Sequence, residues 1–286
     1  MAFFDRLRDR IRATDGTLAV GLNPVLARLP DDCREYDYPR RAFTRRIVDA
    51  THEHVAAYTV SPAFYADAEG WTALAETVAY ARGRGVPVVL DAKDGDVPNP
   101  DADLLDAVDA VTVSPYLGRD ALAPLLDRDV GVFVTCRTPN AGAADLQDRP
   151  VACEGEREGG TDDEGDDGAP TLAEEIASLV ASWADDAAAD VGLLVGGPTE
   201  AVESLRERAP ERPFFVVGGA RNDPAVAAHA APETGADAGV GLVETSREVL
   251  YAGETAGRGR RRGQDDYAAA AREAARRLKR QLNRHR

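Results

Sequence analysis

The sequence predicts a (β/α)8 barrel, a closed sheet of eight parallel strands that alternate with helices. Two observations predict this fold. Eight short runs rich in Val, Leu and Phe recur along the chain, with amphipathic stretches between them, and each run is apolar almost throughout rather than at alternate positions. Such continuous runs are typical of parallel strands that are covered on both faces. Regular alternation of strand and helix then favours the barrel.

The expected elements follow one another along the whole chain. The strands are predicted at residues 18–22, 56–61, 87–92, 110–114, 131–136, 192–197, 214–218 and 238–243. The helices are predicted at residues 39–55, 70–84, 101–107, 119–127, 170–189, 198–209, 223–230 and 245–251. A doubly wound open sheet is the alternative, but no GxGxxG fingerprint follows the first run, which disfavours a dinucleotide-binding fold.

The length suits one barrel with two additions. The chain has 286 residues, and a barrel needs roughly 250, so we expect it to occupy residues 1–253. Residues 154–169 are acidic and rich in Gly, which predicts a disordered insertion between the fifth strand and the next helix. Residues 254–286 predict a basic linker and a C-terminal helix from Asp265 to about Arg284, interpreted as a solvated tail.

Composition excludes several classes of function. The net charge of −16 disfavours nucleic acid as a partner, because most of the surface repels phosphates. No apolar run approaches the ~18 residues of a membrane span, and the N-terminus lacks a secretion signal, so we expect a cytoplasmic protein without membrane contact. The three cysteines show no CxxC spacing, which disfavours a disulfide framework and a zinc cage.

Lysine is rare in this chain. Only Lys93 and Lys279 occur among the 34 Lys and Arg residues, which leaves 32 arginines. An acidic chain that uses Arg in place of Lys is typical of proteins from salt-loving microbes. A lysine retained at a strand end therefore indicates a purpose.

The third apolar run ends in the segment PVVLDAKDGDV, which places Asp91, Lys93 and Asp96 at and just beyond a strand end. Asp91 and Lys93 are two residues apart and so point to the same side of a strand. In barrels of this type the reactive groups lie at the C-terminal ends of the strands. In a dry pocket Asp91 could oppose a substrate carboxylate while Lys93 stabilises and protonates the carbanion left by carbon dioxide. A structural ion network at the strand end is the alternative.

The segment with Asp91 and Lys93 is one of several along the chain that resemble the motifs of a known family and occur in the same order as in that family. They are DAKDGDV, AVTVSPYLGRDAL, GVFVTCRTPNAGAADLQD, VGLLVGG and TSREVLYAG. Over about residues 1–253 the chain resembles the type 2 orotidine 5'-phosphate decarboxylase family. The resemblance implies a cofactor-free homodimeric barrel that converts orotidine 5'-phosphate to UMP in pyrimidine biosynthesis, with no metal.

The resemblance also implies roles for individual residues. Asp91 would face the substrate carboxylate, Lys93 would donate the proton, Asp96 would reach into the partner's site and Arg247 would pair with the phosphate. The other implied substrate-binding positions are Asn23, Thr59, Thr138, Pro139, Gly218 and Gly219.

Some of these positions depart from the family pattern. Asn23 replaces an Asp, Thr59 stands where a second lysine of the charge network belongs, and Pro139 replaces a Ser. The phosphate loop has become VGGARNDPA and keeps only part of its glycines. The loss of a lysine at position 59 leaves Asp91 and Asp96 with one nearby cation instead of two, which is expected to raise a carboxylate pKa of that pair.

These departures leave two other functions open. One is a catalytically impaired paralogue that binds a pyrimidine nucleotide in a regulatory or sensing role. The other is a metal-assisted barrel acting on a sugar phosphate, which is disfavoured because the sequence shows no additional Glu or His cluster.

Overall fold

The predicted barrel is confirmed. The structure, a computed structural model, describes residues 2–94, 102–151, 169–219, 223–255 and 264–286. Within these ranges eight strands close into a barrel in sequence order, and every neighbouring pair is parallel. The strands are β1 (Leu18–Gly21), β2 (Ala57–Val60), β3 (Val88–Asp94), β4 (Ala110–Val113), β5 (Gly131–Thr135), β6 (Asp190–Val195), β7 (Phe214–Val216) and β8 (Leu242–Thr245).

The last strand begins later than predicted. β8 starts at Leu242 instead of residue 238 because Gly239 has a φ of +76° and turns the chain just before it. Gly241 then lies so close to Ala230 that a Cβ there would be 2.3 Å from the Ala230 carbonyl oxygen. Residues 238–241 are therefore a connection and not part of the sheet.

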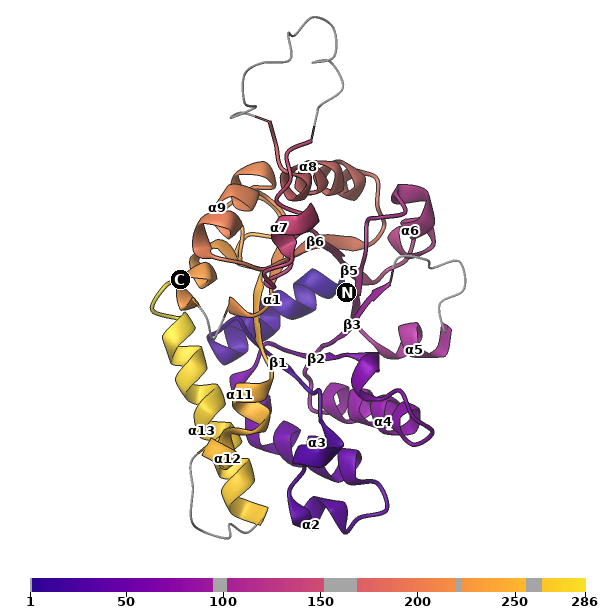
Figure 1. The fold of residues 1–286 in the computed structure, drawn as a ribbon, viewed down its shortest axis with the longest axis vertical. Helices are drawn as coiled ribbons and strands as arrows, with labels where there is room; N and C mark the ends of the chain where they lie inside the picture. Colours follow the sequence, from indigo (N-terminus) through magenta and orange to yellow (C-terminus); the bar gives the residue numbers. More distant parts are fainter. Residues whose placement is uncertain (1, 95–101, 152–168, 220–222, 256–263) are drawn as a thin grey trace, which may run out of the picture.

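Helices surround the barrel as predicted (Figure 1). The described α-helices are α1 (Phe3–Thr14), α2 (Asp31–Arg34), α3 (Pro39–Thr51), α4 (Gly70–Gly83), α5 (Ala102–Ala107), α6 (Arg119–Leu126), α7 (Ala143–Leu146), α8 (Leu172–Asp185), α9 (Thr199–Arg208), α11 (Arg247–Leu250), α12 (Ala252–Thr255) and α13 (Gln264–Leu282). Short 3-10 helices are η1 (Leu26–Arg28), η2 (His52–His54), η3 (Pro62–Phe64) and η4 (Pro224–His229). The segment predicted as a helix at 223–230 is thus the 3-10 helix η4. None of the described helices is both long and apolar enough to cross a membrane.

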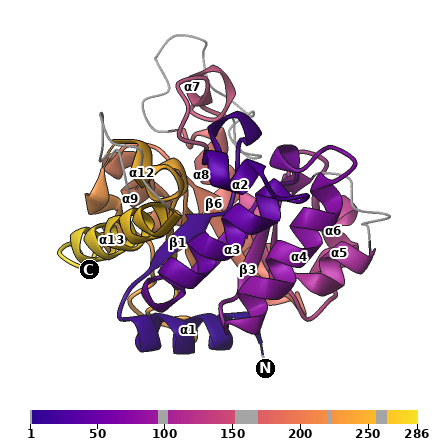
Figure 2. The same ribbon diagram turned by 90° about the horizontal axis from the view of Figure 1, so that it is seen from below.

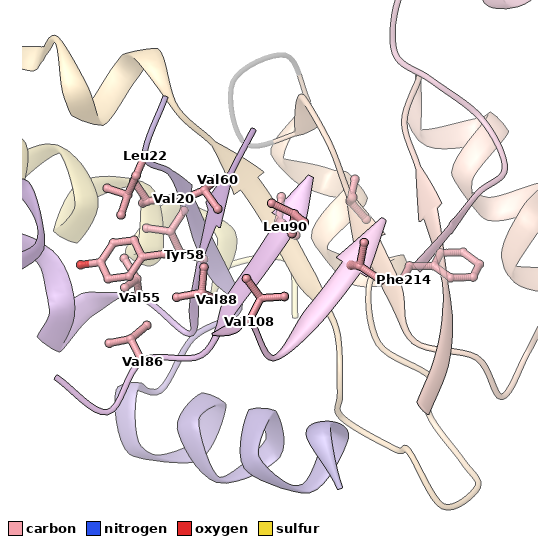
Figure 3. Packing of buried hydrophobic residues seen from close by; sticks show 14 of the residues in the cluster. Val20, Leu22, Val55, Tyr58, Val60, Val86, Val88, Leu90, Val108 and Phe214 are labelled. Carbon is pink, nitrogen blue, oxygen red and sulfur yellow. The ribbon is translucent and has the colours of Figure 1, made fainter. Parts of the chain in front are cut away.

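Alternate residues of each strand enter two different cores. Outward-facing side chains such as Val20, Tyr58 and Val88 pack against the surrounding helices, and Figure 3 shows this layer around Tyr58 and Leu90. Their neighbours, such as Ala19 and Ala57, fill the barrel interior. This division explains the continuous apolar runs, because both faces of each strand are buried.

The N-terminal helix closes one end of the barrel. Phe3, Phe4 and Leu7 of α1 are buried in the same cluster as the interior residues Phe133 and Phe215. Figure 2 shows α1 lying across that end, below the strands. The opposite end, where the strands finish, is therefore the open end at which a ligand could enter.

The C-terminal helix α13 is not a solvated tail. Its buried residues recur at helical spacing and form one apolar face: Ala271, Ala274, Ala275, Leu278 and Leu282. The Lys279 ammonium donates a hydrogen bond to the Thr14 carbonyl oxygen at 2.7 Å. Charge on the exposed face suggested solvation, but the small and apolar residues on the other face pack against the barrel. The predicted acidic insertion at 154–169 lies outside the described residues except at its last position.

Candidate active site

A polar layer lies inside the open end of the barrel. Side chains two residues apart on a strand point the same way, so each interior apolar residue is followed by another interior position. These positions are occupied by Gly21, Thr59, Asp91, Thr112 and Glu244, which follow Ala19, Ala57, Val89, Ala110 and Leu242. The barrel floor is thus apolar and its mouth is lined by hydroxyl and carboxyl groups.

Asp91 and Lys93 meet as the sequence predicted. The Lys93 ammonium donates to both carboxylate oxygens of Asp91, at 2.5 and 2.7 Å. Asp91 is mostly buried, whereas 40% of the Lys93 side chain is exposed. The carboxylate therefore faces the interior and the ammonium lies at the mouth, where it can reach a ligand.

The backbone of Lys93 is held in an unusual conformation. Its φ is +51°, in the left-handed region that residues other than Gly rarely adopt. The register between β3 and β4 shifts between Leu90 and Asp94. The Thr112 hydroxyl accepts a hydrogen bond from the Lys93 N–H at 3.0 Å and donates to Asp91 Oδ1 at 2.9 Å. Strain of this kind concentrates at functional sites, because the surrounding structure must maintain it.

Glu244 is a site residue that the sequence reasoning missed. It lies on β8, and its Oε1 accepts a hydrogen bond from the Thr59 hydroxyl at 3.2 Å. Thr59, which occupies the position of the expected second lysine, is therefore paired with an acid. Alternation along the segment LVET could have indicated Glu244, since it is two residues after the interior Leu242. The late start of β8 hid that pattern.

Burial raises the pKa of Glu244 from its ordinary value of 4.5 to about 7. The negative charge of Asp91 raises the pKa further, while the Thr59 hydrogen bond and the positive charge of Lys93 oppose the rise. The raised pKa thus belongs to a residue that the sequence did not single out, and its main cause is burial and not the missing lysine.

This raised pKa predicts a pH-dependent effect of Glu244→Gln on stability. Between pH 4.5 and about 7 the carboxyl ionises in the unfolded chain but keeps its proton in the folded one. Folding stability that is present below pH 4.5 is thus lost as the pH rises to about 7, by at most about 3 kcal/mol. Glutamine does not titrate, so the stability of the variant relative to the natural protein should increase between about pH 5 and about pH 8.

Urea unfolding of the natural protein and of Glu244→Gln at about pH 5 and about pH 8 measures this change in relative stability. The exposed Glu233, changed to Gln, is the control for the loss of one surface carboxylate. An identical pH dependence for Glu244→Gln and Glu233→Gln would contradict the assignment of a partly buried Glu244 that keeps its proton up to about pH 7.

Asn23 joins the ends of the first two strands. Its Oδ1 accepts a hydrogen bond from the Ser61 N–H at 2.9 Å. Asn23 also lies close to Gly21, because a Cβ at Gly21 would be 3.0 Å from Asn23 Nδ2 and 2.6 Å from Glu244 Oε1. The structure thus brings Asn23, Thr59 and Glu244 together around the bare backbone of Gly21.

The segment after β5, residues 137–139, is held in place by hydrogen bonds and close packing. The Thr138 N–H and hydroxyl donate to Gln147 Oε1 at 2.7 and 3.1 Å. Arg137 donates to both carboxylate oxygens of Asp148 at 2.8 Å and to the Gly196 carbonyl at 2.6 Å. Pro139 packs on Gly196, where a Cβ would be 2.8 Å from Pro139 Cδ. Thr138 and Pro139 therefore lie between the ends of β5 and β6, and their contact with substrate stays a prediction.

The expected phosphate-binding residues follow the last two strands. Gly218 has a φ of +74°, and Gly219 lies so close to Val226 that a Cβ there would be 2.4 Å from it. Arg247 begins α11 directly after β8, is exposed, and has no ion-pair partner among the described residues. Loops after strands seven and eight frequently bind phosphate in barrels of this kind.

Two further residues, Asp96 and Cys136, follow the third and fifth strands in the sequence. Asp96 lies outside the described residues, so its reach into a partner stays a prediction. Burial raises the pKa of the Cys136 thiol, and its Sγ donates to the Ala173 carbonyl oxygen at 2.9 Å, so Cys136 packs in the core and is not activated as a nucleophile. The described residues contain no group of three or more His, Cys, Asp or Glu side chains arranged to hold a metal.

Comparison with known proteins agrees with this geometry. A family model described as orotidine 5'-phosphate decarboxylase / HUMPS family matches residues 34–220. The chain is 46% identical to an orotidine 5'-phosphate decarboxylase from Halobacterium salinarum and 47% identical to one from Halorubrum lacusprofundi, with all of this chain and all of each relative covered.

A solved structure shows the same fold. The OMP decarboxylase from Leishmania donovani superposes with a TM-score of 0.75 at 30% identity, covering 100% of this chain and 98% of the other. Residues 34–220, which match the family model, include both the Asp91–Lys93 pair and the hydrogen-bonded segment 137–139 after β5. This chain belongs to the orotidine 5'-phosphate decarboxylase / HUMPS family.

Proposed function

We propose that this protein decarboxylates orotidine 5'-phosphate to UMP. The observation that carries the proposal is the Asp91–Lys93 pair at the open end of the barrel, in a chain whose full-length relatives are named for this reaction. The polar mouth, closed below by α1, provides one entrance for the nucleotide.

The geometry assigns a role to each charged group. The Asp91 carboxylate would face the carboxylate of the substrate and disfavour the bound ground state by repulsion. When the carbon–carbon bond breaks, carbon dioxide leaves and the electron pair stays on the pyrimidine carbon. The Lys93 ammonium stabilises this carbanion and transfers a proton to it, and the neutral amine then takes a proton from water.

Arg247 would hold the phosphate at the other side of the mouth. Its guanidinium has a permanent charge and a planar fork that suit a phosphate. Because β8 is separated from β3 by β1 and β2 in the closed barrel, a ligand bound at Arg247 would extend across the mouth toward Lys93. Gly218 and Gly219, on the neighbouring β7 side, would lie near the same phosphate.

A direct assay tests the reaction. Purified protein at high salt is incubated with orotidine 5'-phosphate, and the loss of its absorbance is followed. Turnover supports the proposal. Tight UMP binding without turnover would contradict it and indicate the sensing paralogue instead.

The proposal includes a homodimer in the cytoplasm of a salt-loving organism. The family resemblance supports the dimer, and the acidic composition together with the relative from Halobacterium salinarum supports the environment. Size-exclusion chromatography at micromolar protein is expected to give a dimer at high salt. A monomer there would contradict the cross-subunit role of Asp96.

A further inference from the structure

Glu244 occupies the mouth of the barrel without a cation of its own. The described charged groups that influence its pKa are Asp91 and Lys93, both on β3. The Lys93 ammonium already binds both oxygens of Asp91. Glu244 has no ion-pair partner among the described residues, and it accepts a hydrogen bond from the neutral Thr59 hydroxyl.

The other neighbours of Glu244 are neutral. Gly21, the last residue of β1, leaves room for the carboxyl, and the uncharged amide of Asn23, which follows β1, lies next to the same glycine. On β2 the neighbour is Thr59, and on β7 the interior residues Phe215 and Val217 are apolar. Among the residues that the structure describes, the polar layer therefore contains two carboxyl groups, Asp91 and Glu244, and one ammonium, that of Lys93.

An anionic ligand would add negative charge to this layer. A nearby negative charge raises the pKa of a carboxyl group, and so does the removal of water from around it, so both favour the protonated form. A protonated carboxyl has an O–H that can donate to a ligand, which an ionised carboxylate lacks. The family pattern has a lysine, a strong hydrogen-bond donor, at position 59, where this chain has Thr59. A protonated Glu244 beside Thr59 would supply a donor in place of that lysine.

We propose that Glu244 is protonated when the site is occupied and donates a hydrogen bond to an acceptor atom of the bound nucleotide, so that binding is coupled to proton uptake. The identity of the ligand rests on the proposed function. The pKa of about 7 in the free protein agrees with this role, because a modest further rise on binding holds the proton at neutral pH.

Calorimetric titration with UMP tests the coupling. At about pH 7.5, titrations in two buffers with different ionisation enthalpies give the number of protons taken up per UMP bound. The natural protein should take up a substantial fraction of one proton. Its affinity should fall by at most about tenfold per pH unit between the pKa of the free carboxyl and that of the bound one, and should level off above that range. Glu244→Gln should show neither effect, because its amide keeps a donor at every pH. Titration of the UMP phosphate is common to both proteins and cancels in the comparison.

Two further variants sharpen the result. Thr59→Val removes the hydrogen bond that favours the ionised carboxylate, so the pH at which affinity begins to fall should move upward. This variant still tests the proposal if Glu244→Gln fails to fold. Glu233→Gln, an exposed carboxylate removed elsewhere, should behave as the natural protein does.

The outcomes separate this inference from the proposed reaction. Equal proton uptake by the natural protein and Glu244→Gln would overturn the role of Glu244 and leave the decarboxylase proposal intact. Proton uptake without decarboxylation would support Glu244 and contradict the reaction. Failure to bind UMP at any pH would overturn both.

Discussion

Lys93→Ala is expected to reduce turnover of orotidine 5'-phosphate by about 10³-fold or more, with little change in the folded structure. Lys93 is the described lysine at the barrel mouth, and it is assigned both stabilisation of the carbanion and donation of the proton. Loss of a single positioned electrostatic donor has an effect of about 10²- to 10³-fold, and loss of the proton donor adds to it. The initial rate of absorbance loss at saturating substrate measures the effect.

The chain provides a matched control in its other lysine. Lys279 lies on α13 and donates to the Thr14 carbonyl, away from the polar layer. Lys279→Ala should retain turnover and lose a little stability through this hydrogen bond. If Lys93→Ala kept turnover within a few-fold of the natural protein, the Asp91–Lys93 pair would be a structural ion pair and not the reacting centre.

Phe133→Ala is expected to lower the free energy of unfolding by about 3–5 kcal/mol. Phe133 is fully buried inside the barrel, and its ring contacts three other aromatic rings: Phe3 at 6.1 Å, Phe4 at 6.0 Å and Phe215 at 5.5 Å between centroids. Its removal would leave a cavity where the barrel interior meets α1. Urea unfolding at constant salt measures the loss.

Phe64→Ala is the control for this prediction, because Phe64 is 38% exposed on the 3-10 helix η3. Its effect should be much smaller than that of Phe133→Ala, since less apolar surface returns to water. Equal losses for the two variants would show that α1 does not close the barrel through Phe133.

The sequence predicted the site well where strand register could be read locally. Asp91 and Lys93 lie two residues apart on one strand, so the period of a strand predicted that they would meet. The left-handed backbone of Lys93, which Thr112 of β4 helps to hold, was not predictable from this spacing. Glu244 and Thr59 meet although 185 residues separate them. Barrel closure places β8 on one side of β1 and β2 on the other, so side chains of β8 and β2 can meet above Gly21 of β1. No local pattern contains that contact.

The helices at the two ends of the chain show the same distinction. The sequence predicted a helix from Asp265 to about Arg284, but its charge suggested solvation. Only its packing against α3 and α11 explains the burial of its Ala and Leu face. At the other end, no helix was predicted before residue 39, whereas the structure has helix α1 and places its Phe3 and Phe4 under the barrel.

The sequence by itself determined the alternation of strand and helix, the barrel and the Asp91–Lys93 pair, because each depends on spacing along a few consecutive residues. Tertiary structure alone decided that α1 closes one end, that α13 joins the core, and that Glu244 shares the mouth with Asp91. These depend on which distant surfaces meet when the sheet closes, and burial then alters the chemistry of the groups enclosed, as the pKa of Glu244 shows.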